Sequence, residues 1–499
     1  MADWQIVRGG RLLDARRQSA DPTDILIKGD EIAEVGPPGM AAPAEARAVS
    51  AEGFLLHPGL VNAHTHSHSN LSKSAGDLWT LELLLAAGSW ITGRRGPEDN
   101  YISTLVGACE MLLKGCTAAY DLVIEIPIAT VDGIQAAARA YMDAGMRAVI
   151  APAVTDMTMY YAVPGLLDAF PADLRRQVET IRGAPTAESL APLRPLLHGW
   201  NFDRERVRPA LAPSIPILCS DEFVMACRDM AREYSVGIHT HLLESKIQAV
   251  VGKKRYGATV TAHLDKLGAL GPNFTGAHGV WVDTDDMRRL ADHGAHIAHN
   301  PSSNMRLGNG IARVKEMRDL GVNVGIGTDS VTCSDNLNMY EAMRLAALSS
   351  RAQSPDTARW LSAIDCFEGA TIASAKALGF EKIGRIAPGF KADIVFLDLG
   401  AINWIPLVNP INQVVLTEDG TSVDSVMVGG RFAVRHRKLV HVDLADLKRK
   451  AEIAKDNLLA HTTERRDLFD KALPIVNSFC PAIAHQHYHV ERYAQNSNG

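Results

Sequence analysis

The sequence predicts an α/β protein in which a barrel of eight parallel strands carries a second, smaller β domain. One observation is the regular alternation of short apolar segments with amphipathic helical segments through the middle of the chain. Another is that polar residues gather where these apolar segments end. The third is that short strand-like segments occur near both ends of the chain, with too few at either end to form a domain alone.

The smaller domain is expected to be a β-sandwich built from both termini, from residues 1–57 and 386–445. Neither set of strands is large enough to close a sandwich comfortably, whereas the two together are. Gly29-Asp30, between two extended runs, is a hairpin signal. The expected strands lie within 5–8, 10–13, 24–36, 392–399, 413–416 and 423–434.

The barrel is expected over residues 58–385. Its eight predicted strands are 59–66, 116–122, 147–152, 208–213, 236–241, 274–280, 295–300 and 322–329. Eight such strands favour a closed (β/α) barrel. Polar residues gather at their carboxyl ends, which is where barrel enzymes hold their chemistry. Gly115 is expected to cap the helix before the second strand. Segments 67–100 and 155–207 are too long for plain connections and are expected to cross the barrel mouth or its flank.

The remaining segment, residues 446–499, is expected to begin as an amphipathic helix, which spans 444–459, and to end in a tail. Residues 484–489 (AHQHYH) alternate like a short strand. We expect this tail to pack on a neighbouring subunit or to stay mobile, with a second metal site as the lesser alternative.

Composition excludes several function classes. The net charge is −6 and no window clusters Lys and Arg with aromatic residues, so nucleic-acid binding is set aside. The start lacks a basic and apolar leader, and no apolar run approaches the roughly 20 residues of a membrane span, so we expect a cytoplasmic protein without membrane contact. The seven cysteines are scattered and include no Cys-x-x-Cys pair, which argues against disulfides and a thiolate zinc site.

Four residues at strand ends predict a metal site. His64 and His66 end the first strand, where residues two apart share a face, His241 ends the fifth strand and Asp329 the eighth. Three imidazoles and a carboxylate suit one divalent cation, with zinc preferred and iron the alternative, and leave a position open for water. Each residue taken alone is more often an ordinary polar group, so the prediction depends on the set.

Two further residues are predicted to act on the substrate beside Asp329. Glu244 lies three residues beyond His241, at a strand-to-helix turn, where a carboxyl of raised pKa could take a proton from an activated water and pass it to a leaving group. His278, at the end of the sixth strand, could hold the metal hydroxide or polarise the bond under attack. A non-catalytic metal-binding protein of the same fold is the least favoured alternative, because it would not need Glu244 and His278.

Five residues are candidates for substrate contact. They are His68, Trp79, Trp90, Ser214 and Asn304. His68 follows the first pair of predicted ligands, and the two tryptophans lie in the first long segment. A structural role for the histidine and core packing for the tryptophans are the alternatives.

The motifs resemble those of the amidohydrolase superfamily, and more closely its branch of cytosine, guanine and methylthioadenosine deaminases and triazine hydrolases. The segments that carry the resemblance are 62–66 (NAHTH), 239–245 (HTHLLES), 299–310 (HNPSSNMRLGNG) and 327–330 (GTDS). The resemblance covers about residues 5 to 435. It implies a distorted (β/α)8 TIM barrel with a composite β-sandwich, the same ligands and catalytic partners, and a homodimer or larger assembly.

Two departures refine this expectation. Binuclear members of the superfamily bridge two metals with a modified lysine after the fourth strand, where this chain reads ALAPS at 210–214, so we predict one metal ion per subunit. Purine-type deaminases of the branch read Ala-Pro-His-Ser-Pro-Tyr-x-Cys there, whereas residues 212–219 read APSIPILC. Ser214 and Ile217 predict a roomier and more apolar pocket, which argues against adenosine-like and guanine-like substrates.

We therefore predict a metal-dependent hydrolase of small molecules in which an activated water attacks the carbon of a C–N bond. Hydrolytic deamination of an aminated heterocycle is favoured. The alternatives on the same mononuclear site are hydrolysis of an amide, urea or carbamate, and removal of another leaving group, as in dehalogenating or triazine-type hydrolases.

Overall fold

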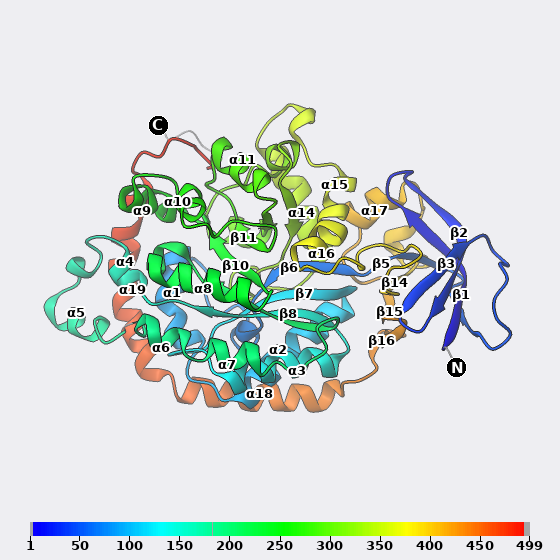
Figure 1. The fold of residues 1–499 in the computed structure, drawn as a ribbon, viewed down its shortest axis with the longest axis horizontal. Coiled ribbons are helices and arrows are strands. Elements are labelled where there is room, and N and C mark those ends of the chain that lie inside the picture. The colour runs from blue at the N-terminus through cyan, green and yellow to red at the C-terminus, as the bar shows by residue number, and fades with distance from the viewer. Residues whose placement is uncertain (1–2, 182, 494–499) are drawn as a thin grey trace.

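The computed structural model describes residues 3–181 and 183–493, and Figure 1 shows a barrel with a smaller β domain at one end. Eight strands form one parallel sheet in sequence order. They are β6 (Leu60–Thr65), β7 (Cys116–Val123), β8 (Arg147–Val154), β9 (Val207–Pro213), β10 (Gly237–Leu242), β11 (Phe274–His278), β12 (His296–His299) and β13 (Asn323–Ile326). The predicted barrel is confirmed, with all eight strands within a few residues of their expected positions.

The barrel closes where its first and last strands meet. Thr65 at the end of β6 forms a parallel bridge with Asp329, just beyond β13. The backbone N–H of Asp329 donates to the carbonyl of His64 at 2.9 Å, and the hydroxyl of Thr65 donates to the carbonyl of Asp329 at 3.3 Å. The seam of the barrel is therefore made by residues of the predicted metal site and their neighbours.

The terminal segments together build one small β domain, as predicted, and its nine strands form a single sheet. They are β1 (Trp4–Asp14), β2 (Ser19–Lys28), β3 (Glu31–Gly36), β4 (Arg47–Ser50), β5 (Phe54–Pro58), β14 (Ile394–Asp398), β15 (Val423–Val428), β16 (Arg431–Arg435) and β17 (Lys438–Leu439). The two halves join where β5 pairs antiparallel with β14. A buried cluster that includes Val7, Ile25, Leu56 and Phe396 gives this sheet a core of its own. Gly29, at a φ of +64°, turns the hairpin between β2 and β3.

Two buried contacts connect this sheet to the barrel. Arg147, at the start of β8, donates two hydrogen bonds to Asp393, at 3.0 and 3.2 Å. His57 of β5 lies 2.8 Å from the hydroxyl of Tyr340, and burial lowers the pKa of His57 to about 4. Both contacts lie away from the barrel mouth and serve the joint between the two parts.

Helices cover the barrel and fill its long connections (Figure 1). They are α1 (Leu81–Ile91), α2 (Pro97–Leu113), α3 (Val131–Ala144), α4 (Met159–Ala162), α5 (Ala172–Val178), α6 (Thr186–Leu190), α7 (Leu193–His198), α8 (Asp221–Glu233), α9 (Lys246–Tyr256), α10 (Val260–Lys266), α11 (Thr284–Asp292), α12 (Pro301–Arg306), α13 (Val314–Asp319), α14 (Met339–Ala352), α15 (Ala363–Glu368), α16 (Ser374–Ala377), α17 (Pro410–Leu416), α18 (Leu444–Ala460) and α19 (Thr463–Ala484). Gly115, at a φ of +77°, follows α2 as expected. Among the described residues, no helix is both long and apolar enough to cross a membrane.

The predicted strand at 413–416 is wrong, because these residues belong to α17. Pro410 occupies the first turn and the side chain of Asn409 accepts from the N–H of Asn412, which are both helix-starting features. Ile411, Val414 and Val415 are buried at helical spacing. The short apolar run fitted either period, and packing against α14 and α15 selects the helix.

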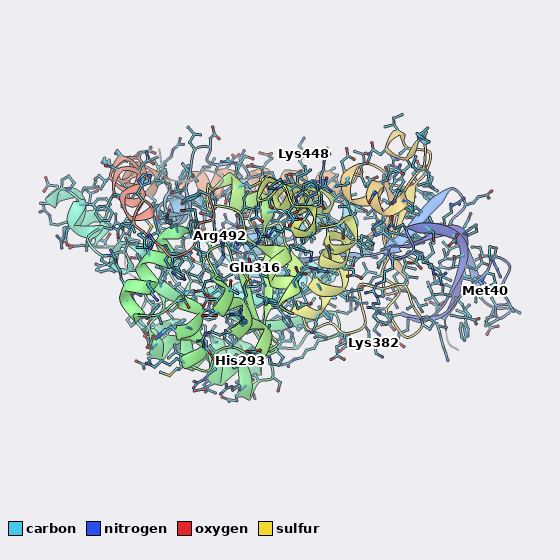
Figure 2. All side chains as sticks on the ribbon, turned by 90° about the horizontal axis from the view of Figure 1, so that it is seen from above. Met40, His293, Glu316, Lys382, Lys448 and Arg492 are labelled. Carbon is cyan, nitrogen blue, oxygen red and sulfur yellow. The ribbon has the colours of Figure 1, made fainter. Side chains whose placement is uncertain are left out.

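The C-terminal segment departs further from expectation. Helix α18 is confirmed, whereas α19 was not predicted and contains Pro474 and Pro481. The expected strand over 484–489 is wrong, because these residues end α19 and continue as irregular chain. The described part of the tail packs on the chain's own barrel, where Arg492, labelled in Figure 2, donates to the carbonyls of Val280 and Val282. Contact of the tail with a neighbouring subunit stays a prediction.

Candidate metal centre and active site

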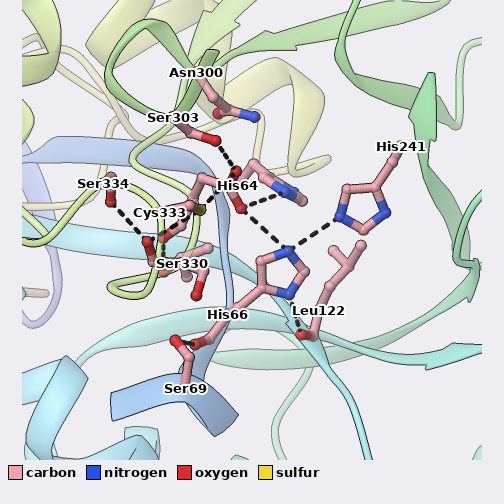
Figure 3. A network of polar contacts seen from close by, with 12 residues as sticks. His64, His66, Ser69, Leu122, His241, Asn300, Ser303, Ser330, Cys333 and Ser334 are labelled. Atoms are coloured by element: carbon pink, nitrogen blue, oxygen red, sulfur yellow. Dashed lines mark hydrogen bonds and ion pairs between the residues drawn. The ribbon is translucent and has the colours of Figure 1, made fainter. Parts of the chain in front are cut away.

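Three buried imidazoles point one ring nitrogen each toward a common centre, because their other nitrogen is already held (Figure 3). Nδ1 of His66 donates to the carbonyl of Leu122 at 2.8 Å, and Nδ1 of His241 donates to the carbonyl of Ser214 at 2.6 Å. Nδ1 of His64 lies 3.1 Å from Nε2 of His239. Such outer contacts fix the ring orientation of metal-binding histidines.

The distances at the centre suit a four-coordinate cation. Nε2 of His64 and Nε2 of His66 lie 3.3 and 3.2 Å from Oδ1 of Asp329. Nε2 of His66 lies 3.1 Å from Nε2 of His241. Ligand atoms about 2.1 Å from a tetrahedral ion stand roughly 3.4 Å apart, close to these values. Nε2 of His64 is buried without a hydrogen-bond partner, so the donor set fits a bound metal.

Electrostatics favour the ligating forms of these groups. Burial lowers the pKa of His64 to about 3 and holds the pKa of His241 well below its usual value, so both rings are neutral. Burial opposes ionisation of Asp329, yet the close contacts with His64 and His66 hold its pKa well below the usual range. The pKa of His66 is raised, because Asp329 outweighs the effect of burial. Metal binding requires a neutral imidazole, so at His66 it competes with protonation of the ring.

Glu244 lies beside this centre, on the turn between β10 and α9. Its Oε1 accepts a hydrogen bond from Nδ2 of Asn309 at 3.0 Å. Its Oε2 is buried without a hydrogen-bond partner and lies 3.6 Å from Nε2 of His278. Burial, followed by the charge of Asp329, raises the pKa of Glu244 well above its usual value. A buried carboxyl with a raised pKa suits general acid–base chemistry.

His278 completes the group at the end of β11. Its Nδ1 donates to Oδ1 of Asn304 at 2.9 Å, and its Nε2 lies 3.8 Å from Oδ2 of Asp329. Burial lowers the pKa of His278, which keeps the ring neutral. The backbone of His278 and that of Asp329 have φ values of +73° and +66°. Non-glycine residues adopt this conformation at a cost of roughly 1–3 kcal/mol, and such residues cluster at functional sites.

The residues proposed for substrate contact divide into two groups. Asn304 and the carbonyl of Ser214 hold the rings of His278 and His241, and the ring of His68 lies 5.3 Å from that of His66. Trp79 and Trp90 instead contact Phe469 of α19, at ring distances of 5.3 and 5.6 Å. Substrate contact by these five residues stays a prediction.

Sequence reasoning missed three partners of the site. Ser303 donates to Oδ2 of Asp329 at 2.5 Å (Figure 3), Asn309 holds Glu244, and the indole N–H of Trp281 donates to the carbonyl of Asn309 at 2.8 Å. Ser303 and Asn309 lie inside the motif 299–310, which was the available signal. No sequence signal pointed to Trp281, because its contact with Asn309 depends on the three-dimensional fold.

Known proteins resemble this chain over most of its length. The amidohydrolase family matches residues 55–433. A 5'-deoxyadenosine deaminase of Methanothermobacter thermautotrophicus is 33% identical over 439 residues, which are 87% of this chain and 94% of that protein.

Solved structures agree with this relationship. An adenosine deaminase from Xanthomonas campestris with bound zinc superposes with a TM-score of 0.78 at 25% identity, covering 91% of this chain and 98% of that one. Atrazine chlorohydrolase from Arthrobacter aurescens complexed with zinc superposes with a TM-score of 0.80 at 27% identity, covering 90% and 99%. The chain belongs to the amidohydrolase family and is a metal-dependent hydrolase that acts on non-peptide carbon–nitrogen bonds.

Proposed function

We propose that the protein hydrolytically deaminates an aminated heterocycle at a mononuclear centre. His64, His66, His241 and Asp329 would hold one divalent cation, zinc in preference to iron. The observation that carries this proposal is the convergence of three Nε2 atoms and Oδ1 of Asp329, next to a buried carboxyl of Glu244 with one free oxygen.

A bound divalent cation would lower the pKa of a water molecule and so supply the nucleophile. Glu244 takes the proton that this water loses, because its unpartnered Oε2 faces the centre. The water oxygen adds to the ring carbon, the C–N bond breaks, and Glu244 returns the proton to the departing nitrogen, which leaves as ammonia. His278, fixed by Asn304, polarises the carbon under attack.

The chain just after β9 bears on the choice of substrate. Ser214 and Ile217 are both buried there and occupy the positions where purine-type deaminases carry His and Tyr. The similarity to a 5'-deoxyadenosine deaminase supports an aminated ring as substrate, whereas these two residues argue for a ring other than an ordinary purine nucleoside. Aminated pyrimidines and triazines are therefore the first rings to test.

A second candidate function uses the same centre with a different leaving group. The atrazine chlorohydrolase superposes over nearly its full length, which favours loss of halide or of an alkylamine from a triazine-type ring. Hydrolysis of an open amide, urea or carbamate is the remaining alternative from the sequence.

One assay separates these reactions. Metal-loaded enzyme is incubated with aminated pyrimidines, purines and triazines, chlorotriazines, and open amides and ureas, and the products are scored for ammonia, amine, halide and carboxylate. Ammonia release that is lost in metal-depleted enzyme supports the proposal. Amine, halide or carboxylate without ammonia would replace it with the corresponding alternative.

The assembly and organisation of the chain are part of the same proposal. We propose a homodimer or larger assembly in the cytoplasm, and sedimentation velocity would test the assembly. We keep the domain boundaries at 57/58, 385/386 and 445/446, which limited proteolysis would test. Family likeness supports the assembly, and the pairing of β5 with β14 supports the composite domain.

A further inference from the structure

Glu244 is held by a pair of turns that lie far from it in the sequence. Asn309 donates from Nδ2 to Oε1 of Glu244 at 3.0 Å, which leaves Oε2 facing His278. The carbonyl of Asn309 in turn accepts from the indole N–H of Trp281 at 2.8 Å. The backbone N–H of Trp281 donates to the carbonyl of Leu243, next to Glu244, at 2.9 Å. The position of the catalytic carboxyl therefore depends on the turns around residues 281 and 309.

Arg492, in the tail after α19, connects these two turns. Its guanidinium donates to the carbonyls of Val280 and Val282, at 2.9 and 2.6 Å, on either side of Trp281. Its backbone carbonyl accepts from the N–H of Ile311 at 2.9 Å. Gly310 makes this approach feasible, because a Cβ there would stand 2.9 Å from the carbonyl oxygen of Arg492.

The rest of the tail strengthens this attachment. Glu491 pairs with Lys246, two residues beyond Glu244, at 3.4 Å. The ammonium of Lys246 also lies over the rings of Trp281 and Tyr493, at 5.4 and 5.6 Å. Arg492 itself is 6% exposed. Burying a charged guanidinium costs free energy unless it is hydrogen-bonded. The hydrogen bonds of Arg492 to the backbone carbonyls beside Trp281 are therefore specific contacts.

We propose that Arg492 is a positioning residue, which fixes Glu244 for proton transfer by locking the Trp281 and Asn309 turns together. The inference rests on the proposed function, because it takes Glu244 as the acid–base group. Arg492 touches neither the predicted ligands nor Glu244, so its effect passes through Trp281 and Asn309. The C-terminal tail, which lies outside the barrel in sequence, is on this account part of the active site.

The test combines kinetics with local exchange. Arg492→Met keeps the apolar stem and removes the guanidinium hydrogen bonds to Val280 and Val282, whereas Arg492→Lys retains a donor. We expect Arg492→Met to lower kcat roughly 10-fold to 10²-fold with KM little changed, as for a small misplacement of a catalytic group. Arg492→Lys should fall in between. In a Glu244→Gln background, Arg492→Met should cost no more than about twofold, because the group that it positions no longer transfers a proton.

Hydrogen–deuterium exchange provides a readout that needs no substrate. In Arg492→Met we expect faster exchange in peptides covering 242–248, 279–283 and 304–311, with peptides covering β6 unchanged and metal content retained. Arg208→Met is the matched control, because Arg208 also donates to backbone carbonyls, those of Arg204 and Gly379, but at the start of β9. Arg208→Met should change kcat by the same factor in the wild-type and Glu244→Gln backgrounds, and it should leave exchange at the three peptides unchanged.

The outcomes separate the two proposals. Equal losses from Arg492→Met in both backgrounds, or unchanged exchange at the three peptides, would overturn the positioning role. If no compound in the panel turns over while exchange rises as expected, the link from Arg492 to the Glu244 turn stands and the proposed function fails.

Discussion

Replacing Glu244 with Gln tests whether this residue is a catalyst or a ligand. Gln can keep the hydrogen bond from Asn309 to its carbonyl oxygen, and its amide takes the place of Oε2, which has no hydrogen-bond partner. The shape of the site is preserved and only the titrating proton is lost. The variant also removes a carboxyl whose pKa is raised by burial and by Asp329, so stability should be unchanged or slightly higher.

The expected loss in turnover follows from general acid–base catalysis. Removing a positioned proton-transfer group typically costs about 10²-fold to 10⁴-fold in rate, or roughly 2.7–5.5 kcal/mol in the activation free energy. The assay measures kcat on metal-loaded protein, metal content by mass spectrometry and the melting temperature. We expect wild-type metal content with kcat reduced within that range.

Glu418→Gln is the matched control. Glu418 is also buried and accepts from the indole N–H of Trp404 at 2.9 Å, far from the barrel mouth, so its replacement should leave kcat unchanged. A Glu244→Gln protein with wild-type turnover refutes the proton-transfer role. One that loses its metal makes Glu244 a ligand.

Three further predictions concern the metal, the domain joint and pH. A chelator should abolish activity and lower the melting temperature modestly, and added zinc or iron should restore activity. Asp329→Ala should lose the metal. Full activity in verified metal-free protein would contradict the metal assignment. Asp393→Asn leaves the buried Arg147 without its charge partner and should lower the free energy of unfolding by about 3–5 kcal/mol in denaturant titrations, and a loss below 1 kcal/mol would refute the role of this pair. Burial lowers the pKa of His57 to about 4, so between that pH and about 6.5 the unfolded chain binds a proton that the folded protein does not. Stability should therefore fall as pH drops through this window, by up to roughly 3 kcal/mol from His57 alone, and His57→Gln should flatten the dependence in thermal melts at several pH values.

The barrel could be predicted from sequence because each strand is a short apolar run that ends in a polar residue. Runs of this kind, alternating with amphipathic helices, are typical of buried strands in a parallel sheet. Helix α19 could not, because Pro474 and Pro481 interrupt the helical signal while its buried face supports it in the folded protein. The run at 413–416 fitted both a strand and a helix, and only tertiary packing decides between them.

The candidate site shows the same division. His64, His66, His241 and Asp329 were identified because their side chains recur at strand ends in a known order. The φ values of His278 and Asp329, and the connection from Arg492 to Asn309, depend on contacts between segments that nothing in the local sequence relates.

The seam of the barrel has a consequence for how the protein is made. The closing contact joins Thr65 to Asp329, which are 264 positions apart. During synthesis His64 and His66 emerge early, but their carboxylate partner exists only after nearly the whole barrel has been translated and β13 has docked. An incomplete or truncated chain thus presents a histidine pair without the full ligand set. Tight metal retention would then distinguish finished molecules from those that stalled before the ring of strands was complete.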